Sequence, residues 1–237
     1  MCAQTRLLIV TAHPDDESFP IGGAIARYAS QGVHVTLLCA TRGEKGIPGV
    51  AAAETARIRE QELRNAAALL GVAEVRFLDL IDGEVAQTPV DALAERVLTV
   101  MRQVRPDAVI TFGPDGISGH PDHVAMSHAT TQAFDRAVAG QMLAPTARLL
   151  YITPSEATLQ GCGVPPLPQL AGGPVAAIDV GAFLTTKVRA AQQHASQHPP
   201  FTGAPEEEAE KLACHEYFTL VRGGPALSSS TFDDLFF

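Results

Sequence analysis

Two short segments, far apart in the chain, carry the side chains best suited to chemistry. The first, His13–Pro14–Asp15–Asp16–Glu17, places one histidine and three carboxylates within five residues, and the second, His120–Pro121–Asp122–His123, adds two histidines. His13, Asp16 and His123 could converge on one ion as two imidazoles and one carboxylate. This donor set is typical of catalytic zinc but also suits non-haem iron. The spacing therefore predicts a metal site without choosing the metal.

The neighbouring side chains suggest how such a site would act. Zinc lowers the pKa of bound water to roughly 7, which makes hydroxide available at neutral pH. Asp15 lies beside Asp16 but points elsewhere, so it is the natural general base. His120, on the same helical face as His123, would donate to the oxygen that becomes negative when a carbonyl is attacked. Together these groups predict hydrolysis of an amide.

Each segment follows a predicted buried strand. Apolar residues run continuously up to Val10, and Pro14 disfavours helix at His13, so the acidic segment is expected in a loop at the strand's carboxyl end. A strand over 108–112 and a loop rich in glycine precede Pro121, which suits the first turn of a helix. In open parallel sheets this edge binds ligands, which predicts one shared site.

The rest of the chain alternates between the two kinds of element. Strands are predicted over 6–10, 33–40, 75–78, 108–112, 149–152 and 175–180, with an extended segment over 217–221. Helices are predicted over 21–31, 54–70, 90–104, 122–139, 182–197 and 206–215, and a long loop or lid over 153–174. This alternation predicts an α/β fold: a largely parallel sheet with helices on both faces, in a single domain over 1–237.

Composition excludes several classes of protein. A formal net charge of −9 and the absence of a basic run argue against nucleic acid as a partner, and favour a small neutral or cationic substrate. No apolar run approaches the ~20 residues of a membrane span, and residues 1–6 lack the features of a secretory signal, so a cytoplasmic protein is expected. The four cysteines form no CxxC pair, which argues against a thiolate zinc site. The apolar tail within 223–237 is expected to dock on this subunit or on a neighbour in a homo-oligomer.

The segment from Ala12 to Glu17, together with His120–Pro121–Asp122–His123, resembles the LmbE and PIG-L superfamily of zinc-dependent deacetylases. These enzymes remove acetyl groups from N-acetylglucosamine conjugates, and several bacterial members serve thiol pathways of the bacillithiol or mycothiol type. Other features resemble the family in family order: Gly22–Gly23, Thr41–Arg42–Gly43–Glu44, Arg59 with Glu62, Asp82–Gly83, Arg105–Pro106–Asp107, His194–Ala195–Ser196–Gln197 and Glu216–Tyr217–Phe218. The likeness thus extends over most of the chain.

The resemblance implies a Rossmann-like fold and a role for each site residue. Zinc would be held by His13, Asp16 and His123, with Asp15 as general base and His120 steadying the tetrahedral intermediate. Three further residues match substrate-binding positions or positions near the site: Arg59, Asp82 and His194. One departure is Ser118, which stands where some members have a tyrosine that polarises the carbonyl; a replacement from the 153–174 loop cannot be read from the sequence.

The sequence therefore predicts a zinc-dependent deacetylase that acts on a small N-acetylglucosaminyl molecule, for example a bacillithiol precursor. One alternative is an amidase that cleaves thiol S-conjugates. A second is a non-catalytic sugar- or metal-binding member of the fold, although neither Asp15 nor any ligand is lost. A third is an iron-dependent oxygenase, which would need dioxygen and a reductant.

Overall fold

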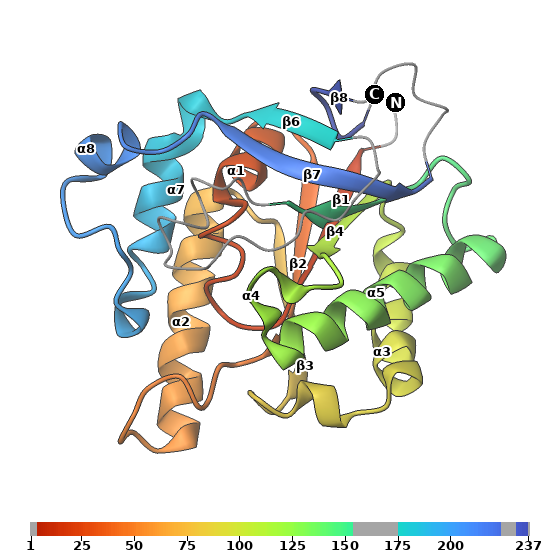
Figure 1. Ribbon diagram of the computed structural model, residues 1–237, viewed down its shortest axis with the longest axis horizontal. Helices are drawn as coiled ribbons and strands as arrows, with labels where there is room; N and C mark the ends of the chain where they lie inside the picture. The colour runs from red at the N-terminus through yellow and green to blue at the C-terminus, as the bar shows by residue number, and fades with distance from the viewer. Residues whose placement is uncertain (1–3, 154–174, 224–230, 237) are drawn as a thin grey trace.

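The structure, a computed structural model, describes residues 4–153, 175–223 and 231–236 (Figure 1). Its strands are β1 (Arg6–Thr11), β2 (His34–Thr41), β3 (Glu74–Leu80), β4 (Ala108–Phe112), β5 (Arg148–Ile152), β6 (Val175–Asp179), β7 (His215–Arg222) and β8 (Thr231–Phe232). Its α-helices are α1 (Gly22–Ser30), α2 (Ala52–Leu70), α3 (Val90–Val104), α4 (Gly116–Gly119), α5 (Pro121–Ala139), α7 (Leu184–Ala191) and α8 (Pro205–Ala209). Short 3-10 turns are η1 (Val85–Gln87), η2 (Gly181–Phe183) and η3 (Ala195–Gln197).

The described strands form one sheet in the order β3-β2-β1-β4-β5-β7-β6-β8. The first five run parallel, and β7 pairs antiparallel with both β5 and β6. From β1 the chain passes to β2 on one side and later returns to β4 on the other, so the strand order reverses between β1 and β4. Ligands bind at such a switch point, outside the carboxyl ends of the strands.

Helices cover both faces of the sheet, with α1, α2 and α7 on one side and α3 and α5 on the other (Figure 1). The central strands are buried on both faces; Leu7, Leu8, Ile9 and Val10 of β1 are at most 1% exposed. A strand covered on both faces carries continuous apolar residues rather than alternating ones. The predicted α/β architecture is therefore confirmed.

Two predicted helices are shorter in the structure than the sequence suggested. The helix expected over 182–197 is helical only as α7, and His194 lies in the turn before η3 because the following Ser196 bonds to Glu62 of α2. The helix expected over 206–215 ends at Ala209, since His215 already pairs with Asp179 as the start of β7. The loop expected after β4 contains the short helical turn α4. The predicted lid lies outside the described residues, except for Thr153.

The end of the chain docks on this subunit. Leu235 is fully buried and its backbone N–H donates to the Tyr28 hydroxyl at 2.9 Å, while Phe236 packs edge-on against the same ring. The expected docking is thus confirmed for these two residues, and homo-oligomer formation stays a prediction. Among the described helices, none is long and apolar enough to cross a membrane.

Candidate metal centre

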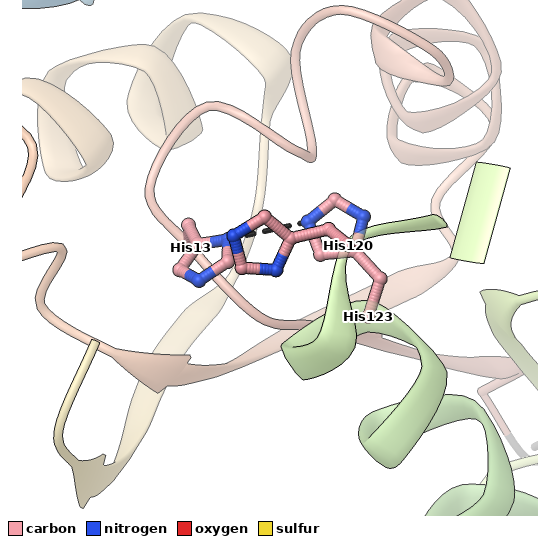
Figure 2. A group of neighbouring side chains, drawn as sticks. All are labelled: His13, His120 and His123. Carbon is pink, nitrogen blue, oxygen red and sulfur yellow. Dashed lines mark hydrogen bonds between the residues drawn. The ribbon is translucent and has the colours of Figure 1, made fainter. Parts of the chain in front are cut away.

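Three imidazoles meet at the carboxyl edge of the sheet. His13 comes from the loop after β1, whereas His120 and His123 come from the start of α5 (Figure 2). The ring centroid of His13 lies 4.7 Å from that of His120 and 5.2 Å from that of His123. The topological switch point between β1 and β4 therefore brings the two sequence segments into contact.

Two of the three distances within the predicted ligand set have the spacing that a metal requires. His123 Nε2 lies 3.2 Å from His13 Nδ1 and 3.3 Å from Asp16 Oδ1, and His13 Nδ1 lies 3.9 Å from Asp16 Oδ2. Donor atoms of a tetrahedral zinc site, with bonds of ~2.0–2.1 Å, are about 3.3 Å apart. We call His13, Asp16 and His123 the candidate metal centre. The two distances from His123 Nε2 fit a zinc ion, whereas His13 and Asp16 are 3.9 Å apart, measured to Oδ2.

In each of the two histidine ligands, a hydrogen bond to the other ring nitrogen orients the imidazole. His13 Nε2 faces Asp122 Oδ2 at 3.1 Å and Asp82 Oδ1 at 3.2 Å, which places a proton on Nε2 and leaves Nδ1 as the ligand atom. The other imidazole is fixed in the same way, because His123 Nδ1 lies 3.0 Å from the Gly116 carbonyl and donates to it. Both histidines thus present a lone pair toward the other and toward Asp16.

Asp16 is held by the backbone of its own loop. Its Oδ2 accepts the N–H groups of Ala12 at 3.1 Å and of His13 at 2.8 Å, while Oδ1 faces His123. The loop that follows β1 therefore positions one carboxylate oxygen for a metal and uses the other to fix its own shape. A buried carboxylate needs such donors, and Asp16 is only 8% exposed.

Asp122 is a site residue to which sequence reasoning gave no role. It is fully buried, accepts the N–H of Gly83 at 2.7 Å and bonds to His13. Two groupings of possible ligand atoms lie within 4.8 Å of one another, and neither includes Asp16: His13 with His120 and His123, and His13 with Asp82 and Asp122. The signal for Asp122 was its place between the two histidines of the second segment.

The predicted general base lies against an arginine. Asp15 Oδ2 accepts from Arg59 at 3.1 Å, and the same guanidinium donates to the carbonyl groups of Pro14 at 2.7 Å and Gly43 at 3.1 Å. Burial of the Asp15 carboxyl, together with the negative charge of Asp16, raises its pKa to about 7, although Arg59 opposes the shift. A carboxyl with a pKa near neutrality can both accept and return a proton at physiological pH.

His120 occupies the N-cap position of α5. Its Nδ1 accepts the backbone N–H of Asp122 at 3.2 Å, so the ring's proton is on Nε2. Burial and the neighbouring rings of His13 and His123 lower the pKa of His120. The ring is therefore a neutral donor through Nε2, as an oxyanion partner requires.

The three residues predicted to bind or adjoin substrate all contact other parts of the protein. Arg59 is 4% exposed and engages Pro14, Asp15 and Gly43. Asp82 accepts from the backbone N–H of Lys45 at 3.1 Å and faces His13. The third, His194, is fully buried and bonds to Glu17. The structure thus gathers all three around the loop that follows β1, and their contact with substrate stays a prediction.

Metal uptake should strengthen as pH rises. Burial of His13 lowers its pKa, but hydrogen bonds to Asp122 and Asp82 and the charge of Asp16 outweigh burial and raise the pKa to about 10. A metal must displace this proton at lower pH, so zinc affinity should gain about tenfold per pH unit between about pH 6 and 8. In the metal-free protein the free energy of unfolding changes in the opposite direction to zinc affinity. The stability that the His13 proton contributes is complete below pH 6.5 and is lost as pH rises toward 10. Competition with a chelator measures the affinity, and a value independent of pH would contradict the account.

Comparison with known proteins connects this geometry to a family. The family model described as GlcNAc-PI de-N-acetylase, PIG-L, matches residues 8–134, a span that contains the whole candidate metal centre. The chain belongs to the PIG-L family. This is a deacetylase family, which confirms the resemblance noted from the two segments.

One relative of this PIG-L chain matches it almost end to end. It is a 1D-myo-inositol 2-acetamido-2-deoxy-alpha-D-glucopyranoside deacetylase of Rhodococcus jostii (strain RHA1). The two sequences are 32% identical over an alignment 273 positions long, which covers 93% of each protein.

Two solved structures share the fold. N,N'-diacetylchitobiose deacetylase from Pyrococcus horikoshii is 24% identical with a TM-score of 0.66, over 92% of this chain and 84% of that one. GalB, a 4-carboxy-2-hydroxymuconate hydratase from Pseudomonas putida, is 21% identical with a TM-score of 0.70, over 95% and 99%. Because one neighbour is a hydratase, the fold alone does not decide the reaction.

Proposed function

We propose that this PIG-L protein is a zinc-dependent N-deacetylase, which hydrolyses the acetamide of an N-acetylglucosaminyl small molecule to acetate and a free amine. The observation that carries the proposal is that His123 Nε2 lies within 3.3 Å of both His13 Nδ1 and Asp16 Oδ1, with Asp15 and His120 nearby in the same two segments. The family match and the activity named for the Rhodococcus relative support the same reaction.

The candidate metal centre would hold zinc through His13, Asp16 and His123. Zinc in such a site supplies a water of lowered pKa, roughly 7, and polarises a carbonyl. Asp15 takes the proton released when water attacks the acetamide carbon, because its pKa of about 7 makes it a base at neutral pH. The same carboxyl then gives this proton to the leaving amine, so that acetate and the amine separate.

His120 stabilises the oxygen that becomes negative during this attack. Its Nδ1 is occupied by the Asp122 N–H, so Nε2–H is the group that faces the reaction. Ser118, which stands where some relatives have a tyrosine, lies in α4 two residues before His120. The shorter hydroxyl leaves more of the oxyanion stabilisation to His120.

Replacement of His120 by alanine should lower kcat about 100-fold, within the range measured when one oxyanion donor is removed. KM should change little, because the donor acts on charge that develops only in the transition state. Steady-state acetate release with zinc content measured in parallel checks this. A change in kcat below about threefold would exclude His120 as the oxyanion donor.

The inositol conjugate named for the Rhodococcus relative is the first substrate to test. A bacillithiol-type malate conjugate, as the sequence suggested, is the second, and a thiol S-conjugate cleaved at an amide represents the amidase alternative. All three contain an amide that the site could hydrolyse, so the aglycone decides among them. Cytoplasmic location and the substrate contacts predicted for Arg59 and Asp82 belong to the same proposal. His194 is fully buried and bonds to Glu17, so the proposal gives it no contact with substrate.

Acetate release from N-acetylglucosamine and its inositol and malate conjugates, together with amine release from a thiol S-conjugate, tests the proposed function. We expect turnover of at least one acetylated sugar, with the highest kcat/KM for the inositol conjugate. Turnover of the S-conjugate alone would replace the proposal with the amidase. Stoichiometric zinc without turnover of any compound would favour a binding protein.

A further inference from the structure

We infer that His194 is a positioning residue: through Glu17 it holds the backbone of Asp15 in the conformation in which the carboxyl serves as base. The inference rests on the proposed function for the role of Asp15. It concerns a pair of buried side chains, His194 and Glu17, that the mechanism itself does not use.

Asp15 has a backbone conformation that side chains rarely adopt. Its φ angle is 121°, in the region that favours glycine. A residue other than glycine stays in such a conformation only when its surroundings determine it. Asp15 also opens the turn that carries the loop toward α1, since its carbonyl accepts the N–H groups of Ser18 at 2.9 Å and Phe19 at 3.2 Å. The direction of the Asp15 carboxyl therefore depends on what fixes this turn.

Glu17 supplies one such constraint. Its Oε2 accepts the backbone N–H of Asp15 at 3.1 Å, and its Oε1 accepts from the Ser18 hydroxyl and from His194 Nε2, the latter at 2.7 Å. Glu17 is fully buried, so its carboxylate needs these donors in order to remain where it binds Asp15. Loss of one donor would favour a different position for the carboxylate.

His194 is the donor that comes from elsewhere in the chain. It is fully buried in the turn between α7 and η3, and Ser196 anchors this turn to α2 by two bonds to Glu62, at 2.8 and 2.7 Å. Within the described part of the chain, His194 Nδ1 has no hydrogen-bond partner. The polar contacts of the ring are therefore made by Nε2, with Glu17 and at 3.4 Å with the Ser18 hydroxyl.

Hydrogen bonds thus connect α2 to the turn before η3, and this turn to the loop after β1. The last of them, from the Asp15 N–H to Glu17, fixes the backbone of the proposed general base. Since both Glu17 and His194 are completely buried, neither is placed to touch substrate directly. The effect of His194 on the reaction is then indirect. It should appear in kcat, through the position of Asp15, rather than in KM or in metal content.

Two replacements that differ by one methylene test this path. In His194→Gln the side-chain nitrogen can lie near the place of Nε2 and donate to Glu17, whereas in His194→Asn it is too short to do so. His194→Leu removes the donor altogether. Lys187→Met is the matched control, because Lys187 on α7 forms a buried ion pair with Glu216, at 2.6 Å, rather than with Glu17.

The first readout is hydrogen exchange of the Asp15 amide in metal-free protein, which needs no substrate. We expect exchange at least about tenfold faster than in the wild type for His194→Asn and His194→Leu, and near the wild-type rate for His194→Gln and Lys187→Met. The second readout is acetate release. There kcat should fall about 100-fold in the first two variants with KM and bound zinc unchanged, and His194→Gln should recover most of it.

Unchanged Asp15 exchange in a folded His194→Asn or His194→Leu protein would overturn the inference, as would equally fast exchange in Lys187→Met. So would a His194→Gln protein that behaves like His194→Asn in both readouts. If the wild type releases no acetate from any conjugate, the proposed function fails, while the exchange of the Asp15 amide still decides whether His194 positions that residue.

Discussion

Replacement of Asp15 by asparagine is expected to reduce kcat for acetate release about 1000-fold, within the range found for groups that move a proton. The amide keeps an oxygen for Arg59, which contacts Asp15 Oδ2 at 3.1 Å, so the loop should keep its shape. It cannot, however, take a proton from the attacking water. Zinc content should stay near that of the wild type, because the ligands proposed for the metal are other residues. Steady-state kinetics with metal analysis on the same samples measure both quantities.

Asp79→Asn provides the matched control. Asp79 is also an aspartate with a positive φ, 54°, but it pairs with Arg42 on the outside of the molecule. Its replacement should leave kcat unchanged. If Asp15→Asn kept activity within about tenfold of the wild type, proton transfer by Asp15 would be excluded, because general acid–base groups contribute 10²–10⁴-fold.

Replacement of His123 by alanine is expected to remove both metal and activity. Its Nε2 is the atom nearest to both other proposed ligands, 3.2 Å from His13 and 3.3 Å from Asp16. Loss of one of three protein ligands should weaken zinc binding on the order of 10²–10³-fold, judging from the binding energies of complete sites. Acetate release should fall to background at limiting zinc. Zinc affinity by chelator competition, with activity at each zinc concentration, checks this.

His128→Ala is the comparison for this variant, because His128 also lies on α5 but outside the candidate metal centre. It should bind zinc as the wild type does. If His123→Ala retained wild-type zinc affinity, the ligand set would have to be redrawn around His13, Asp82 and Asp122, the grouping of possible ligand atoms that lacks His123.

Much of the fold could be predicted because its elements have strong local signals. Helix α3 has the bounds predicted from its apolar periodicity, Val90–Val104, and β4 those predicted from its apolar run. The predictions failed where tertiary contacts override propensity. Residues 192–197 have helix-forming composition, but the bonds from Ser196 to Glu62 hold them in a turn followed by the short 3-10 segment η3 instead of a continued α-helix. Residues 210–215 leave the helix because β6 offers His215 a partner strand.

The candidate metal centre was predictable for a different reason. The histidines and the aspartate that form it lie close to prolines in the segments that follow two buried strands. Because β1 and β4 are parallel neighbours, both segments start from the same edge of the sheet. The residues that hold the ligands and Asp15 in position were not predictable, because only the contacts seen in the structure reveal their role. Asp122 is noticed once its Oδ2 is found 3.1 Å from His13 Nε2, and Glu17 once its carboxylate is found on the Asp15 amide.

The rival reactions differ in what they consume. An iron oxygenase would need dioxygen and a reductant, whereas the deacetylase needs only water. A hydratase, as GalB is named, would add water to a carbon–carbon double bond and release no acetate. Acetate and free amine formed in equal amounts under anaerobic conditions would therefore exclude both. The donor set of two histidines and one aspartate does not make this distinction, because zinc and non-haem iron share it.

Zinc titration of the metal-free protein, with acetate release from the inositol conjugate of N-acetylglucosamine followed at each step, tests the central claim most directly. We expect activity to rise in proportion to bound zinc and to stop rising at one zinc per chain. Full acetate release before zinc is added, or one tightly bound zinc with no release of acetate from this or any other N-acetylglucosaminyl conjugate, would contradict it.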